Sequence, residues 1–197
     1  MSGIRTQKAK LRAQILRTRA ALTADEREAA AAALMERVRA LPGRPDTATV
    51  AAYVSMGTEP GTRPLIGAMQ NAGSRVLLPV LLPDNDLDWA EYRSPDALVR
   101  TERGLFEPTG PRLGPDAVTQ ARLILLPGLA ADAHGVRLGR GGGSYDRVLD
   151  RVERAGTRPE VVVLLYAHEV IASVPKEPHD HLVDAAITPE GLHRFRS

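Results

Sequence analysis

The sequence predicts a three-layer α/β fold, in which helices flank a mainly parallel sheet, and three observations support this. Short apolar runs at 50–54, 76–80 and 160–166 are typical of buried strands. Helical patterns separate these runs, and strands that alternate with helices indicate parallel pairing. The length of 197 residues suits one domain with a sizeable core. We therefore expect a single Rossmann-like domain over residues 1–197.

Two helices open the chain. Apolar positions at helical spacing predict the first helix over residues 4–21. The second begins after Thr23, because a threonine N-cap followed three residues later by Glu26 is a capping-box pattern. We expect it to end at Pro42-Gly43, where the helical pattern stops.

The middle of the chain continues the alternation. After the first strand, a helix is expected over residues 63–72, and Gly73 ends it. The strand at 76–80 follows, and the alternating pattern of 87–92 is typical of an antiparallel strand. The segment 93–117 is rich in proline and glycine, and we expect it to be irregular.

The last third of the chain repeats the strand–helix pattern. A strand at 122–126 precedes a glycine-rich segment, and a helix is expected over residues 144–154. After the buried strand at 160–166, a short strand at 184–188 and a terminal helical turn close the chain.

The topology predicts where a ligand binds. In parallel α/β sheets, ligands bind beyond the carboxyl ends of the strands. This rule brings three segments to one rim, namely Ser55–Glu59, Pro127–Tyr145 and Ala167–Glu169.

The composition is that of an ordinary globular protein. The chain has no cysteine, which excludes disulfides and thiolate-bound metal. Its longest apolar runs fall far short of the roughly 20 residues of a membrane helix. The basic N-terminus lacks the apolar segment of a signal peptide, and we expect a cytoplasmic protein that binds no membrane. A net charge of +2 does not imply a nucleic-acid partner, and we expect none.

The segment Arg137–Arg147 is the most informative part of the chain. Four glycines lie within residues 139–143, between a predicted strand and a predicted helix, with arginines around them. Such a loop lets backbone N–H groups converge on an anion, and arginines add bidentate hydrogen bonds to phosphate oxygens. Asp146 would repel a phosphate unless Mg²⁺ lies between them. The pattern predicts a nucleotide or polyphosphate site; a structural glycine turn with a solvated basic rim is the alternative.

The loop differs from two common phosphate-binding motifs. No Gly-Lys-Ser/Thr ends it, so it is not a P-loop, and the third glycine of a dinucleotide fingerprint falls on Ser144.

A basic N-terminal run has three interpretations: a solvated helix face, an anion-binding arm folded toward the glycine loop, or a nucleic-acid contact. The residues that precede the first acidic residue are Arg5, Lys8, Lys10, Arg12, Arg17 and Arg19.

These features together resemble the 5-formyltetrahydrofolate cyclo-ligase family over nearly the whole chain. The strongest match is the glycine loop, where the family shows Arg-Leu-Gly-x-Gly-x-Gly-aromatic-Tyr-Asp-Arg. The matching residues are Lys8, Arg12 and Arg19; Ser55, Met56 and Glu59 with Pro64-Leu65-Ile66; Glu107-Pro108; Leu126–Ala130 with Asp132; Arg137–Arg147; and Pro175, His179-Asp180, Asp184 and Thr188.

The resemblance implies an ATP-dependent ring closure on a reduced folate. The formyl oxygen on N5 attacks the γ-phosphate of ATP, N10 attacks the activated carbon, and phosphate leaves. The products are 5,10-methenyltetrahydrofolate, ADP and phosphate. The implied enzyme uses ATP and Mg²⁺ on a reduced folate. Separately, we expect a monomer, and positive surface charge favours folates with acidic polyglutamate tails.

The resemblance also assigns roles to single residues. Asp146 and Asp180 hold Mg²⁺, and Arg140 and Tyr145 act on the reacting groups. The residues assigned to the folate are Val54, Met56, Glu59, Arg140 and Ser144. The residues assigned to ATP are Lys8, Arg12, Arg137, Leu138, Gly139, Arg140, Gly141, Gly142, Gly143, Ser144 and Tyr145.

The chain departs from the family pattern at three positions. Ser144 stands where an aromatic residue is usual, Gly142 where lysine is frequent, and Glu169 where glutamine is frequent. Two alternatives share the expected fold. One is a non-catalytic relative that binds nucleotide or RNA, and the other is a related ATP-using enzyme acting on another amide or heterocycle.

Overall fold

A seven-stranded sheet forms the centre of the fold. A computed structural model of the chain describes residues 3–41, 48–178 and 180–195, and strand counts refer to this part. In spatial order the strands are β12 (Gly191–Arg194), β11 (Ala185–Thr188), β9 (Glu160–Leu164), β6 (Leu123–Pro127), β1 (Thr49–Ala51), β2 (Arg75–Leu81) and β3 (Leu87–Glu91). The five inner strands run parallel, and each edge strand pairs antiparallel with its neighbour. The predicted mainly parallel sheet is confirmed.

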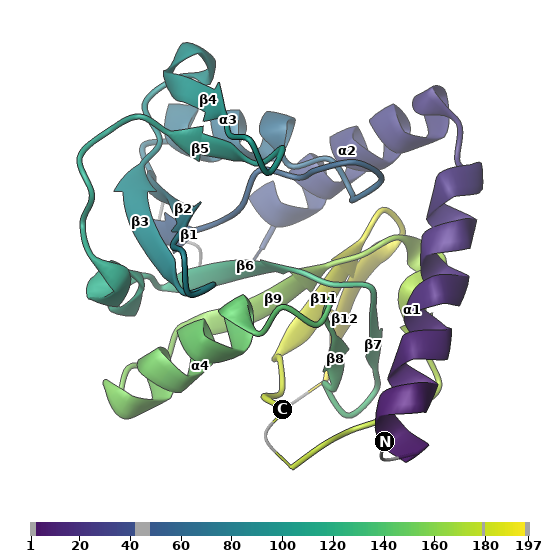
Figure 1. Cartoon of the computed structure of the whole chain (residues 1–197). Helices are drawn as coiled ribbons and strands as arrows, with labels where there is room; N and C mark the ends of the chain where they lie inside the picture. Colours follow the sequence, from purple (N-terminus) through teal and green to yellow (C-terminus); the bar gives the residue numbers. More distant parts are fainter. Residues whose placement is uncertain (1–2, 42–47, 179, 196–197) are drawn as a thin grey trace.

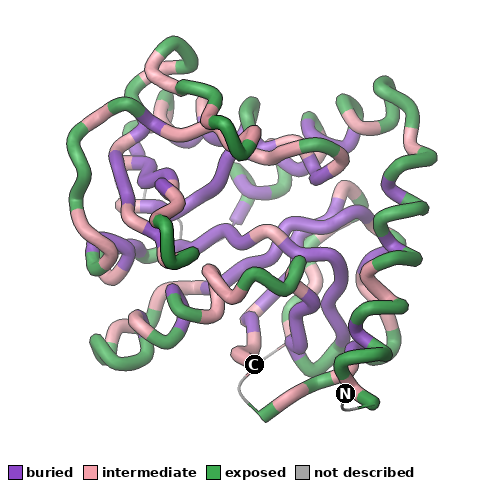
Figure 2. The backbone as a smooth tube through the Cα atoms, in the orientation of Figure 1, coloured by how far each residue is buried: buried purple, intermediate pink, exposed green. Residues whose placement is uncertain are grey.

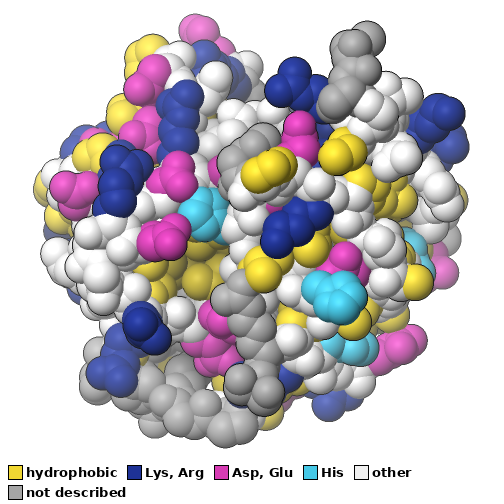
Figure 3. Space-filling model, turned by 90° about the horizontal axis from the view of Figure 1, so that it is seen from below, with side chains coloured by type: hydrophobic (Ala, Val, Ile, Leu, Met, Phe, Trp, Pro, Cys, Tyr) yellow, Lys and Arg dark blue, Asp and Glu magenta, His cyan; other side chains and the backbone are white. Residues whose placement is uncertain are grey.

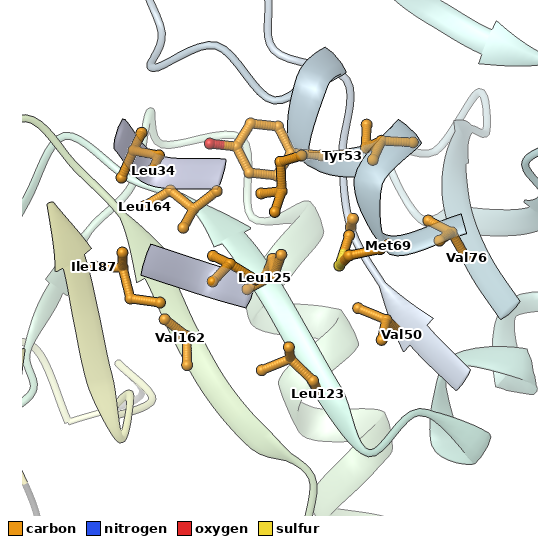
Figure 4. Close-up of a cluster of buried hydrophobic side chains, with 14 of the residues drawn as sticks. Leu34, Val50, Tyr53, Met69, Val76, Leu123, Leu125, Val162, Leu164 and Ile187 are labelled. Atoms are coloured by element: carbon orange, nitrogen blue, oxygen red, sulfur yellow. The ribbon is translucent and has the colours of Figure 1, made fainter. Parts of the chain in front are cut away.

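Helices cover both faces of this sheet (Figure 1). They are α2 (Ala24–Arg39) and α3 (Arg63–Asn71) on one face and α4 (Ser144–Arg154) on the other, whereas α1 (Gly3–Ala21) lies at the side of the sheet. Side chains alternate along a strand, so Leu123 and Leu125 belong to the core cluster with α2 and α3 (Figure 4), whereas Ile124 and Leu126 belong to the cluster with α4. The sheet therefore lies between two helical layers, α2 with α3 on one face and α4 on the other, which gives the predicted three layers.

The start of α2 follows the sequence signal. Thr23 Oγ1 accepts a hydrogen bond from the Glu26 N–H at 3.2 Å, and the Thr23 N–H donates to Glu26 Oε2 at 2.7 Å. This reciprocal pair is a capping box, which confirms the predicted start. The expected end at Pro42-Gly43 lies outside the described residues.

A second, small sheet lies beside the main one and was not predicted. Its strands are β10 (Val170–Ile171), β7 (Ala130–Asp132) and β8 (Arg137–Leu138). A third core cluster contains residues from this sheet together with Ile15 of α1. Most residues of α1 are exposed, whereas the strands of the main sheet are buried (Figure 2). The small sheet therefore gives α1 a packing surface.

Two sequence expectations are wrong. The C-terminal residues expected to form a helical turn form β12, which pairs antiparallel with β11. The segment 93–117, expected to be irregular, contains a hairpin of β4 (Leu98–Arg100) and β5 (Phe106–Pro108). It also contains the short 3₁₀ helices η1 (Pro95–Ala97) and η2 (Pro115–Gln120). Each of these strands is too short for a period of two to be recognised in the sequence.

Candidate active site

A cavity of about 220 Å³ lies beyond the carboxyl ends of β1, β2 and β6. One wall is the segment after β1, with Tyr53, Val54, Met56 and Glu59. A second wall consists of Pro79, Leu81, Leu87 and the hairpin residues Leu105, Phe106 and Glu107. The third wall consists of Pro127, Gly128, Arg137 and the segment 139–146. Two of the three predicted rim segments therefore meet at this cavity.

Glycine is required at several points of the loop. Gly141 and Gly143 have φ of +96° and +77°, a region that favours glycine. A Cβ at Gly139 would lie 2.9 Å from Arg137 Nη1, so the Arg137 guanidinium, which binds Asp146 and the Pro127 carbonyl, would have to shift. Gly143 precedes α4 without a side-chain cap, so the first N–H groups of that helix remain available to a ligand.

Arg12 connects α1 to the loop. Its Nε donates to the carbonyl oxygen of Gly139 at 2.9 Å, and its guanidinium passes beside Gly141. The basic N-terminal helix therefore lies against the glycine loop, as one of the three interpretations expected.

Arg137 and Asp146 form an ion pair in the wall of the cavity. Arg137 Nη2 donates to Asp146 Oδ1 at 2.9 Å, and Nη1 donates to the Pro127 carbonyl at 3.1 Å. The Arg137 side chain is 5% exposed, whereas that of Asp146 is 40% exposed. Within the described part of the chain, the second carboxylate oxygen of Asp146 has no protein partner. Because protein sites for Mg²⁺ often use one or two carboxylates plus phosphate oxygens, Asp146 fits such an ion.

Lys8 and Asp180 meet each other outside the cavity wall. Lys8 Nζ lies 2.6 Å from Asp180 Oδ2 and 3.0 Å from Glu177 Oε2, and its side chain is 7% exposed. Lys8 holds the pKa of Glu177 below its usual range. No group of three metal-binding side chains occurs among the described residues. His179, also part of the sequence match, lies outside them.

Glu59 is the buried acid of the cavity. Its Oε2 accepts a hydrogen bond from the Met56 N–H at 2.9 Å, and Oε1 lies 3.4 Å from Arg140 Nε. Burial raises the pKa of Glu59. Burial, and Glu59 beside it, also raise the pKa of Tyr145, which therefore stays a neutral hydrogen-bond donor at neutral pH.

The remaining assigned residues divide between the cavity and the core. Gly142 and Ser144 line the cavity, in the open part of the loop. The Leu138 side chain belongs to the third core cluster and does not line the cavity. It fixes the loop instead, since the Leu138 carbonyl accepts from the Leu129 N–H at 2.7 Å.

Sequence reasoning missed a buried ion pair beneath the site. Arg19 donates from Nε and Nη2 to the two oxygens of Glu169, at 2.6 and 2.8 Å, and both side chains are 0% exposed. Arg19 Nη2 also donates to the Gly128 carbonyl at 2.6 Å. The third predicted rim segment, Ala167–Glu169, therefore does not line the cavity. Its Glu169 binds Arg19, which in turn binds the carbonyl of Gly128 in the cavity wall. Arg19 and Glu169 were each singled out in the sequence, but 150 residues separate them and no local pattern pairs them.

One face of the molecule carries mixed charges. On the face shown in Figure 3, the basic and acidic side chains of the described residues are interspersed. None of the described helices has the length and apolar character needed to cross a bilayer.

Comparison with known proteins identifies the family. Residues 4–189 match the sequence model of the 5-formyltetrahydrofolate cyclo-ligase family. The chain is 38% identical to the 5-formyltetrahydrofolate cyclo-ligase of Mycolicibacterium smegmatis over 93% of this chain and 94% of the relative. It is 31% identical to that of Escherichia coli K12 over 89% and 96%. The solved structure of Aquifex aeolicus 5,10-methenyltetrahydrofolate synthetase superimposes with a TM-score of 0.81 at 28% identity, covering 96% of this chain and 93% of that one. The chain belongs to the 5-formyltetrahydrofolate cyclo-ligase family.

Proposed function

We propose that this chain is an enzyme that converts 5-formyltetrahydrofolate and ATP to 5,10-methenyltetrahydrofolate, ADP and phosphate. The observation that carries the proposal is the similarity to a cyclo-ligase at 38% identity over 93% of the chain. The cavity supports it, because a glycine loop able to bind phosphate and a buried acid able to bind a heterocycle share one space.

The reaction needs activation of a poor leaving group. The formyl oxygen on N5 attacks the γ-phosphorus, the bond to the β,γ-bridging oxygen breaks, and ADP leaves. N10 then attacks the activated carbon, and the carbon–oxygen bond breaks as phosphate departs. Loss of the N10 proton leaves the methenyl bridge. The protein mainly orients these groups and stabilises charge on the phosphoryl oxygens.

The glycine loop and the start of α4 are the proposed phosphate site. The N–H groups of the first turn of α4 point toward an anion at the helix N-terminus. The Arg140 side chain is 47% exposed, and its contact with Glu59 is long at 3.4 Å. It is therefore able to turn from Glu59 to the transferring phosphoryl group. Arg12 of α1 adds a second positive charge next to the glycine loop.

Asp146 is the proposed protein ligand for Mg²⁺. Bound there, the ion neutralises charge on the phosphate chain. Arg137 orients the carboxylate through one oxygen and leaves the other for the ion. Asp180 contacts Lys8 and does not line the cavity, so the geometry favours Asp180 as the residue that positions Lys8.

The folate is proposed to bind between the segment after β1 and the β4–β5 hairpin. Val54 and Met56 supply apolar surface, and Glu59 accepts hydrogen bonds from the N–H groups of the pterin ring. Tyr145 lines the same cavity, and its neutral hydroxyl is the proposed group that orients the formyl group. Ser144 contributes to the wall where the family usually has an aromatic ring, and this leaves room beside the folate.

The remaining expectations complete the proposal. We propose a cytoplasmic monomer that accepts polyglutamylated folates and has no nucleic-acid partner.

Ser144 in the cavity wall is the observation that favours the second candidate function, an ATP-using enzyme that acts on another amide or heterocycle.

The first experiment follows absorbance at the methenyl-folate band. Purified protein is mixed with 5-formyltetrahydrofolate and Mg²⁺, with and without ATP. We expect the band to rise only with ATP and to match ADP release. Mg-ATP binding without any rise in the band would contradict the cyclo-ligase proposal and favour the other substrate.

A further inference from the structure

The turn that carries Glu59 has hydrogen bonds of its own. The Glu59 N–H donates to the Met56 carbonyl at 3.1 Å, and the Met56 N–H donates back to Glu59 Oε2 at 2.9 Å. The Ser55 N–H donates to Thr62 Oγ1 at 2.8 Å. All of these bonds lie within residues 55–62, so they fix the local shape of the turn.

Tyr166 connects this turn to a distant part of the chain. It follows β9, and the residue is 4% exposed. Its hydroxyl donates to the Thr58 carbonyl at 3.2 Å, and 108 residues separate the two partners. Within the described residues, no other hydrogen bond joins segment 55–59 to a part of the chain beyond residue 62. Because Thr58 directly precedes Glu59, this bond acts close to the buried acid.

The buried Arg19–Glu169 pair holds Tyr166 in turn. Glu169 Oε2 accepts from the Tyr166 N–H at 2.9 Å, and the Glu169 N–H donates to the Tyr166 carbonyl at 3.0 Å. The Arg19 guanidinium lies over the Tyr166 ring, 5.5 Å from its centroid, which is a favourable cation–π contact. Since both charged side chains are fully buried, they hold the tyrosine hydroxyl at a defined position next to Thr58.

We propose that Tyr166 is a positioning residue, which acts through the Thr58 carbonyl to hold the Glu59 carboxylate where it meets the folate. The inference rests on the proposed function, in which Glu59 accepts hydrogen bonds from the pterin ring. Such bonds weaken when the acceptor is displaced or misaligned, so the acceptor has to be held in place by its surroundings. Tyr166 does not line the cavity, and it therefore affects the folate only through the turn.

The test is the substitution Tyr166→Phe, which removes the hydroxyl and keeps the ring. We expect KM for 5-formyltetrahydrofolate to rise by about twofold to tenfold, the range of one neutral hydrogen bond. KM for Mg-ATP and kcat should stay close to wild type, because the proposed phosphate site lies on the glycine loop. Folate affinity is also measured by calorimetry without ATP, so that the result does not depend on turnover.

A double-mutant cycle separates positioning from a merely structural role. If Tyr166 acts through the Glu59 carboxylate, its substitution has little left to disturb once that carboxylate is gone. We therefore expect Tyr166→Phe to raise the folate KM by less than about twofold in a Glu59→Gln background. A general loss of structure would multiply KM by the same factor in both backgrounds.

Hydrogen exchange tests the contact without any ligand. The N–H groups of Ser55, Met56 and Glu59 are hydrogen-bonded in the turn, so their exchange rates report on its opening. These rates should increase several-fold in Tyr166→Phe.

Tyr92→Phe is the matched control. Tyr92 is 6% exposed, does not line the cavity, and its hydroxyl has no hydrogen-bond partner among the described residues. The same chemical change should there leave both the exchange of the turn and the folate KM as in wild type.

Three results would overturn the inference. They are unchanged folate affinity in Tyr166→Phe, an equal loss of affinity for Mg-ATP, and the same KM factor in both Glu59 backgrounds. Failure of the wild type to form methenyl-folate would instead contradict the proposed reaction. The exchange rates would still decide whether Tyr166 holds the turn, and unchanged rates would show that it does not.

Discussion

Single residues around the cavity differ in how firmly the protein holds them. The guanidinium of Arg137 is nearly covered and bound on two sides, so it is a fixed part of the wall. Arg140 is half-exposed and has one long contact. We expect Arg137 to orient Asp146, the proposed metal ligand, and the more exposed Arg140 to follow the charge that moves during phosphoryl transfer.

Asp146→Asn tests the proposed metal ligand. We expect turnover that depends on Mg²⁺ to be abolished, because a neutral amide is a poor ligand for a hard cation. Stability should change by less than about 1 kcal/mol, because the pair with Arg137 is partly exposed at the aspartate. The measurements are an Mg²⁺ titration of activity and a denaturant melt.

The matched control lies one turn along α4. Asp150 pairs with His181 at 2.6 Å and does not line the cavity, so Asp150→Asn should keep its activity. Near-wild-type turnover in Asp146→Asn would remove Asp146 from the metal site.

Glu59→Gln tests the buried acid through pH. Burial raises the pKa of Glu59, so the folded protein binds this proton more tightly than the unfolded chain does. Stability therefore falls as pH rises above the ordinary glutamate pKa of about 4.3. The variant should melt higher than wild type at neutral pH, and the difference should shrink on acidification toward that pKa. KM for the folate should rise about tenfold, because a bond to a charged acceptor is lost.

Melting curves across this pH range and folate KM values are the measurements for Glu59→Gln. A variant that melts lower than wild type at neutral pH would show that the contacts to Met56 and Arg140 outweigh the penalty of burying the charge.

At the scale of elements, α1 depends on ionic contacts at both ends. Lys8 fixes its beginning to Glu177 and Asp180, and Arg19 fixes its end to Glu169. Between them, Arg12 reaches the glycine loop. These contacts therefore hold the helix against the glycine loop, although few of its apolar residues are buried.

Glu169→Ala tests this attachment. It leaves the Arg19 charge buried without its partner, and we expect a loss of about 3–5 kcal/mol of unfolding free energy. Glu169→Gln keeps one hydrogen-bond acceptor and should lose less. Chemical denaturation measures both. A loss below about 1 kcal/mol in Glu169→Ala would mean that α1 moves to solvate Arg19, and that the pair does not hold the helix.

Elements with a clear local pattern of apolar residues were predictable from the sequence. Short strands, which form only because a neighbouring strand pairs with them, were not. The five parallel strands and the capping box at Thr23 were visible as local patterns. The strands β4, β5 and β12 are three or four residues long and exist because a partner lies beside them. In the site, the glycine loop was evident from its residue types. The Tyr166–Thr58 hydrogen bond and the Lys8–Asp180 contact join residues 108 and 172 positions apart, and both depend on the tertiary structure.

At the scale of the whole molecule, the cavity joins parts of the chain that are held separately. Glu59 follows β1, Phe106 is on the hairpin beside β2, and the glycine loop connects β8 to α4. A ligand that fills the cavity contacts all three segments at once. Binding is therefore expected to stabilise the entire fold and not one loop.

Thermal melts with different ligands test whether a bound ligand stabilises the whole fold. They also test whether the chain binds the folate or RNA. A ligand that binds only the folded chain adds about 2.7 kcal/mol at one hundred times its Kd, which is roughly 5–10 °C for a chain of this size. We expect Mg-ATP to raise the melting temperature, and 5-formyltetrahydrofolate to raise it further. Single-stranded RNA should add nothing beyond Mg-ATP, because the net charge is only +2 and aromatic residues on which bases could stack are scarce. A rise with RNA and none with the folate would favour the non-catalytic nucleotide-binding alternative over the enzyme.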